Sequence, residues 1–179
     1  QEFSWTFRTK DSPFEEIWAI VLSATNGTSK DGNNIAAVAF NGRDGEDEID
    51  ARAIPPLTPD PFRLVFVNQN VSYERDIRNA DGRLSHHWFF VVENAKAGSS
   101  VTISWELSVQ LTRDNRQYQG LQLVEFDQNG GVVNVVPMTP ADGQVGSYTY
   151  TSGGEAARFF RIDVQKASIL AAKNMAKGT

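Results

Sequence analysis

The sequence predicts an all-β protein, an antiparallel β-sandwich of jelly-roll or immunoglobulin-like type with about ten strands. Apolar and polar residues alternate over the stretch VTISWELSVQL, and Gly- and Asn-rich turn signals recur between similar stretches. No helical period extends over ten residues until the C-terminus is approached. A chain of 179 residues can bury a sizeable core. We therefore expect a single domain over residues 1–179.

The clearest strand is residues 101–111, where Val101, Ile103 and Trp105 begin a run of apolar residues at every second position. This period is typical of a half-buried strand, and it places Trp105 in the core. Trp88 has the same parity as Phe90 and is also expected in the core. Further single strands are expected at residues 16–24, 33–41, 62–68, 71–78 and 87–94.

Two hairpins are predicted in the last third of the chain. Residues 120–127 would pair with 132–138 across Asn129-Gly130, a strong tight-turn signal. Residues 146–152 would pair with 157–165 across Gly153-Gly154. Upstream, residues 51–62 hold four of the seven prolines and predict an extended crossover between groups of strands. Residues 166–179 are Ala- and Lys-rich and predict a short C-terminal helix or a tail.

The first ten residues predict an amphipathic strand, because Phe3, Trp5 and Phe7 would share one face of it. Three large aromatic side chains left in water would invite aggregation, so this face must be covered. Two solutions are open. The strand pairs within its own sandwich, or it is donated to an open sheet edge of a neighbouring copy. Repeated head to tail, the second contact builds a filament.

Composition restricts the classes of partner. The net charge of −5 and the isoelectric point near 5.0 disfavour nucleic acid, which needs clustered Lys and Arg. No apolar run is long enough for a membrane span. Gln1 is a residue that can follow a cleaved signal peptide, so we expect an extracellular or cell-surface protein. Asn26 and Asn70 lie in glycosylation sequons whose use the sequence leaves open.

Acidic residues at alternate positions form one candidate metal site. Asp44, Glu46, Glu48 and Asp50 occur in the stretch NGRDGEDEIDAR, and carboxylates at such spacing in a loop can converge on calcium. The stretch lacks the glycine that an EF-hand loop needs at its sixth position. A solvated acidic turn that protects a sheet edge is the alternative interpretation.

No catalytic constellation is evident. His86 and His87 are the only histidines, and neighbours in a strand point to opposite faces, so they would not easily chelate one metal. Without cysteine, thiolate nucleophiles and Cys-based zinc sites are excluded. We therefore expect a protein that is not an enzyme.

Aromatic residues offer a second candidate site, a platform for stacking against sugar rings. Once Trp88 and Trp105 are assigned to the core, this interpretation depends on Trp18, Tyr118, Tyr148 and Tyr150. Tyr148 and Tyr150 share a face near a glycine turn.

The order of short motifs resembles a loose class of uncharacterised secreted bacterial β-sandwich modules with Ig-like character. The matching pieces are Trp18–Val21, Asp44–Asp50, Ile54–Pro56, Arg75–Arg78, Trp88–Val92 and Val101–Trp105. Residues 106–165 resemble the Ig-like half that often closes such proteins. The resemblance implies secretion and a place in cell-surface or multidomain extracellular proteins, and it carries no catalytic residues.

These observations favour a secreted structural or cell-surface subunit that acts by protein–protein contact. It would associate with itself into a homo-polymer, by strand donation, or contact other surface proteins. A carbohydrate-binding module of an extracellular protein is the alternative.

Overall fold

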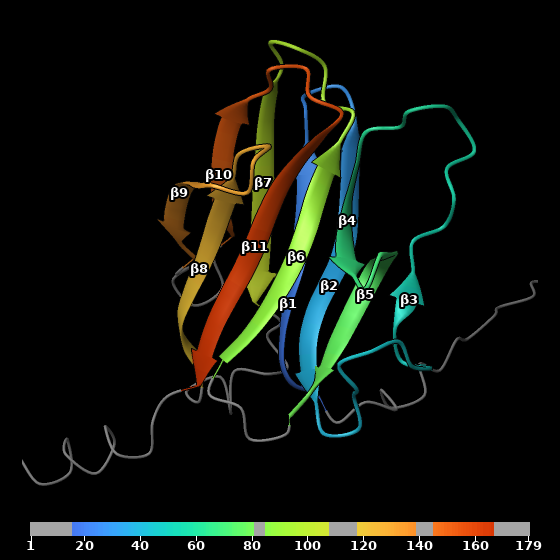
Figure 1. Ribbon diagram of the computed structural model, residues 1–179, viewed down its shortest axis with the longest axis vertical. Coiled ribbons are helices and arrows are strands. Elements are labelled where there is room, and N and C mark those ends of the chain that lie inside the picture. Colours follow the sequence, from blue (N-terminus) through green and yellow to red (C-terminus); the bar gives the residue numbers. More distant parts are fainter. Residues whose placement is uncertain (1–15, 81–84, 108–117, 139–144, 167–179) are drawn as a thin grey trace, which may run out of the picture.

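The computed structural model describes residues 16–80, 85–107, 118–138 and 145–166, and these ranges contain strands and no helix (Figure 1). The all-β class is therefore confirmed for the part of the chain that is described. The strands are β1 (Glu16–Thr25), β2 (Lys30–Ala39), β3 (Ala51–Arg52), β4 (Arg63–Asn68), β5 (Val71–Asn79), β6 (Ser85–Glu93), β7 (Ser100–Leu107), β8 (Tyr118–Phe126), β9 (Val132–Pro137), β10 (Gly146–Thr151) and β11 (Ala157–Lys166).

All eleven strands belong to one mixed sheet, which curls until it is nearly barrel-shaped (Figure 1). Its order is β10-β7-β1-β2-β5-β4-β6-β11-β8-β9, and the short β3 pairs with β5. The β2–β5 pair is parallel and the other pairs are antiparallel. A sandwich of two separate sheets is not confirmed, because hydrogen bonds run through the β2–β5 and β5–β4 pairs and join what would be its two layers.

The core fills the inside of this curled sheet. Trp18 stacks on Trp88 with 5.4 Å between the ring centroids, and Phe90 stacks on Phe160 at 5.2 Å. Trp88 and Trp105 are both buried, as their strand parity predicts. Strands from both halves of the chain contribute to the same apolar cluster, so the described residues share one main core.

A second, smaller cluster lies on the outer face of β1, β2 and β5. Ala37 and Ala39 point outward from β2. Ile77 of β5 and Ile49 of the loop that follows β2 pack against them. This loop, residues 40–50, explains why β1 and β2 are apolar on both faces. The prediction that residues 16–24 are covered on both sides is confirmed at Ala19, whereas Val21 and Ser23 on the same outer face are half-buried.

Only one of the two predicted hairpins forms. β8 and β9 pair across the Asn129-Gly130 turn, where Gly130 has φ 80° and its N–H donates to the Asp127 carbonyl at 3.1 Å. The prediction that residues 146–152 pair with 157–165 is wrong.

Instead, β10 pairs with β7, and β11 lies between β6 and β8. The physical reason is Ser152, whose backbone bonds Ser99 and Gly98 and whose hydroxyl donates to the Ala95 carbonyl at 3.0 Å. These bonds hold Ser152 at the β6–β7 connection. The loop between β10 and β11 then crosses from the side of the core that β7 forms to the side that β6 forms.

Several predictions concern residues outside the described ranges. They are the aromatic strand at residues 1–10, the end of the strand predicted at 101–111, and the helix or tail beyond Lys166.

Candidate functional site

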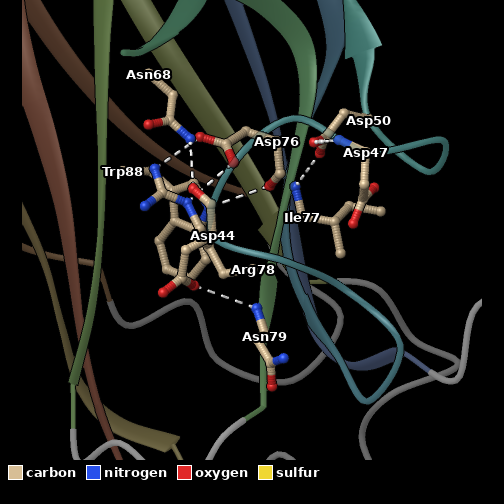
Figure 2. Close-up of polar contacts among 9 residues, drawn as sticks. All are labelled: Asp44, Asp47, Asp50, Asn68, Asp76, Ile77, Arg78, Asn79 and Trp88. Atoms are coloured by element: carbon tan, nitrogen blue, oxygen red, sulfur yellow. Dashed lines mark hydrogen bonds and ion pairs between the residues drawn. The ribbon is translucent and has the colours of Figure 1, made fainter.

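A buried ion pair occupies the end of the core where β5 ends and β6 begins. The Arg78 guanidinium donates to both carboxylate oxygens of Asp76, at 2.9 and 2.8 Å, and Asp76 is 2% exposed. The guanidinium also lies over the Trp88 ring, 5.9 Å from its centroid, and the Trp88 indole N–H donates to the Asp76 carbonyl at 3.1 Å (Figure 2). Burial raises the pKa of Asp76 above its usual range, and the bonds from Arg78 oppose that shift.

The acidic loop closes over this pair. The Asp44 carbonyl accepts a hydrogen bond from the Asn68 side chain at 3.0 Å, and the Asp44 carboxylate accepts one from the Asn79 backbone at 3.4 Å (Figure 2). A pocket of about 330 Å³ opens beside these groups, lined among others by Asp44, Arg78, His86 and His87. Asp44 therefore lies at the end of the core where β5 ends and β6 begins.

Asp47 and Asp50 hold the same loop against the outer face of β5. Asp50 accepts hydrogen bonds from the backbone N–H of Ile77 at 2.8 Å and of Asp47 at 3.0 Å. Asp47 in turn accepts from the backbone N–H of Arg43 and Ile49 at 2.9 Å each. Burial raises the pKa of Asp50 to about 6, although both backbone bonds oppose the shift. These carboxylates therefore cap backbone groups of the loop and its neighbouring strand.

The four residues of the calcium prediction do not converge in this arrangement. The Asp44 and Asp50 carboxylates bond the backbone N–H groups of different residues, Asn79 and Ile77. Glu46 pairs with Arg52 at 2.5 Å, and Glu48 is exposed. Within the described ranges, no three His, Cys, Asp or Glu side chains are placed to hold a metal ion. The calcium prediction has no support from this geometry.

The residues of the predicted sugar platform are also dispersed. Trp18 is 2% exposed in the core, and Tyr150 is buried with its ring 6.2 Å from that of Tyr148. The side chain of Tyr118 lies outside what the structure describes. Trp18 and Tyr150 therefore offer no open face to a sugar ring.

Tyr148 instead belongs to a polar cluster at the opposite end of the core. Its hydroxyl donates to the Glu125 carboxylate at 2.6 Å and accepts from the Asn134 amide at 3.2 Å. Arg158 donates to Glu125 at 2.5 Å and lies 4.4 Å from the centroid of the Tyr150 ring. Because Glu125 is only 2% exposed, its charge has to be balanced inside the protein, and Arg158 supplies the opposite charge.

The outer surface of β6, β11, β8 and β9 carries exposed apolar side chains. Phe89, Phe159, Val133 and Val135 are 48%, 45%, 57% and 47% exposed. Phe126 lies among them: it pairs with Phe159 in the β8–β11 register, and its ring is 6.3 Å from that of Phe89. We call these five residues the outer apolar patch. An apolar surface of this kind is typical of a contact site.

Polar groups border the patch. The Arg161 guanidinium lies over the rings of Phe89 and Phe126, at 5.5 and 5.4 Å, and donates to both oxygens of Asp163. His87 contacts the same carboxylate at 2.7 Å. His86 is buried against Trp88, so the two histidines face opposite sides of β6, as predicted. An apolar centre with Arg and aromatic residues is the composition of protein contact surfaces.

β9 is one end of the strand order. It pairs with β8 on one side, and no described strand pairs with its other side. Val132, Val133 and Val135 on this strand are all exposed. An apolar edge strand is a template for adding another strand.

The two sequons lie in turns. Asn26 is in the β1–β2 turn, where its side-chain oxygen accepts from the backbone N–H of Thr28 and Ser29 at 3.1 and 2.7 Å. Asn70 is in the exposed β4–β5 turn with φ 65°.

Sequence reasoning missed Asp76, Arg78, Glu125 and Arg158. A signal for the first pair was present, because residues two apart in a strand share a face and Asp76 and Arg78 do so in the strand predicted at 71–78. No local signal joins Glu125 to Arg158, since 33 residues separate them.

No helix in the described ranges is long and apolar enough to cross a membrane. No family model, curated protein or solved structure was found to match the chain.

Proposed function

We propose that this protein is a non-enzymatic extracellular or cell-surface subunit that acts by protein–protein contact. Its partner is a second copy of the chain, whose residues 1–10 add as a strand to the free edge of β9. The observation that carries the proposal is the position of the outer apolar patch directly beside that valine-rich edge, with which no described strand pairs. Backbone hydrogen bonds at the edge would supply affinity, and side chains over the patch would supply specificity.

The donor segment suits this acceptor. Phe3, Trp5 and Phe7 alternate with polar residues, so a strand laid beside β9 presents all three aromatic side chains on one face. If the aromatic face of the added strand is on the outer side of the sheet, its three aromatic side chains lie beside Val133 and Val135 and extend that apolar surface. Each copy then offers a donor segment and an acceptor edge. Such a contact is heterologous, and head-to-tail repetition builds a filament.

Two variants test the donor and the acceptor separately. Deletion of residues 1–10 removes the donor, and Val133→Lys with Val135→Lys places charges on the acceptor edge. We expect the unaltered protein to form oligomers or filaments in sedimentation velocity and electron microscopy, and each variant alone to be a folded monomer. Mixing the variants should give one-to-one dimers that do not grow, because only one donor and one acceptor remain.

The control is Ser147→Lys on β10, the strand at the other end of the sheet order. It should assemble like the unaltered protein. A monomeric unaltered protein, or variants that still polymerise, would overturn the proposal. If Ser147→Lys alone failed to assemble, the contact would lie at β10, and the proposal would also be overturned.

A further inference from the structure

The side chain of Asn134 lies in the seam between β9 and β10, the two strands at the ends of the strand order (Figure 1). Its amide nitrogen donates to the Tyr148 hydroxyl on β10 at 3.2 Å, and its amide oxygen accepts from the backbone N–H of Val135 at 2.9 Å. Asn134 is half-buried, whereas Val135 is exposed. One side chain therefore bonds both the facing strand and the backbone of the edge to which a donor strand would add.

The Val135 N–H faces the free edge of β9. In an antiparallel pair, successive N–H groups of one strand point alternately toward the partner strand and away from it. The Met138 N–H donates to the Leu121 carbonyl of β8 at 2.9 Å. The β8–β9 register is regular from Asn134 to Pro137. Val135 is three residues before Met138, so its N–H points away from β8. Pro137 has the same orientation but carries no N–H.

Over residues 134–138, Val135 is thus the only residue with a backbone donor on the free edge. A strand that adds to an edge gains affinity from backbone hydrogen bonds, which need donors as well as acceptors on that edge. The Asn134 side chain already occupies this donor. Asn side chains that bond nearby backbone groups compete with strand pairing, and a covered edge is protected from unwanted addition.

The polar cluster inside the core fixes the orientation of the Asn134 amide. The Tyr148 hydroxyl donates its hydrogen to the Glu125 carboxylate at 2.6 Å, so toward Asn134 it acts as an acceptor. The amide nitrogen therefore faces Tyr148, and the oxygen is left for Val135. Glu125 is held in turn by the Arg158 guanidinium at 2.5 Å. The cap on the edge is anchored to a buried ion pair.

We propose that Asn134 is a gate on the acceptor edge. It closes β9 while its amide oxygen holds the Val135 N–H, and it has to release this group before the strand of a second copy can pair there. The inference rests on the proposed assembly at β9 and names the residue that regulates it. One neutral hydrogen bond changes an equilibrium constant by about fivefold, which sets the expected size of the effect.

Asn134→Ala opens the gate without adding charge or bulk. Sedimentation velocity of the full chain over a dilution series gives the critical concentration for assembly, and this concentration should fall by about fivefold. Asn134→Val, which suits a strand better, should behave in the same way. Gln122→Ala truncates an exposed amide on β8 and is the matched control. It should assemble as the unaltered protein does.

Amide hydrogen exchange below the critical concentration tests the cap without assembly. In Asn134→Ala, the Val135 amide should exchange about fivefold faster or more. The Met138 amide, which bonds β8, should keep its protection and so report an intact fold. Unchanged exchange at Val135 would overturn the gate, and so would equal critical concentrations when the variant and the unaltered protein both assemble. If neither protein assembled at any concentration, the proposed assembly would be overturned, and the gate with it.

Discussion

The hydroxyl of Tyr148 on β10 donates a hydrogen bond to the carboxylate of Glu125 on β8, with 2.6 Å between the two oxygens. β10 is the first strand in the sheet order, and β8 is the last but one. The bond therefore joins the two ends of the curled sheet through its interior. Among the described residues, no backbone hydrogen bonds link β10 to β8 or β9. The side-chain hydrogen bond between Tyr148 and Glu125 connects these two ends of the sheet instead.

Tyr148→Phe should lower the free energy of unfolding by about 1–3 kcal/mol. The change removes a hydrogen bond to a charged group and leaves one Glu125 oxygen without that donor. Urea unfolding followed by tryptophan fluorescence measures the loss. Ser147→Ala, the exposed neighbour, is the control and should change stability by less than about 0.5 kcal/mol. Equal effects in the two variants would show that the bond contributes nothing.

Arg158→Met should destabilise the protein by about 3–5 kcal/mol at neutral pH, because it leaves a buried Glu125 carboxylate unpaired. Glu155→Gln removes only the outer partner of Arg158, at 3.1 Å, and should cost about 1 kcal/mol or less. Urea unfolding of both variants at neutral pH measures the two costs, and equal costs would contradict the explanation.

Asp50 should make stability fall as pH rises. Its pKa is about 6 in the folded protein, against an ordinary value of 3.8, so the folded state binds the proton more tightly than the unfolded chain. Its stabilising contribution is present at low pH and is lost as the pH rises through about 6.

Asp50→Asn removes this titration. It should therefore destabilise the protein more at about pH 4.5 than at about pH 7, as measured by urea unfolding at both values. Glu48→Gln, an exposed change in the same loop, should show no such difference. The opposite sign for Asp50→Asn would refute the assignment of the shift to burial.

Gly146→Ala should destabilise the protein by about 3 kcal/mol or prevent folding. A Cβ atom there would lie 2.1 Å from the Trp105 Nε1, and the buried indole has no room to move. Gly32→Ala is the matched control, because its nearest neighbour would be 3.4 Å away. Thermal unfolding of both variants tests the contrast, and a fully stable Gly146→Ala would show that β10 shifts freely.

By itself, the sequence determined where most strands are and which side chains they bury. Alternation in a strand is a local property, so the positions of Trp88 and Trp105 in the core follow from their parity. The Asn129-Gly130 turn is equally local, because its φ value and its short loop require only neighbouring residues.

Only the tertiary structure decided which strands are neighbours. Gly153-Gly154 has the composition of a tight turn, yet Ser152 bonds the β6–β7 connection and directs β10 and β11 to different partners. For the same reason the acidic loop could not be assigned from its spacing. The Asp44 and Asp50 carboxylates bond the backbone of Asn79 and Ile77, more than twenty residues away in the chain, and such contacts form only once the sheet has curled.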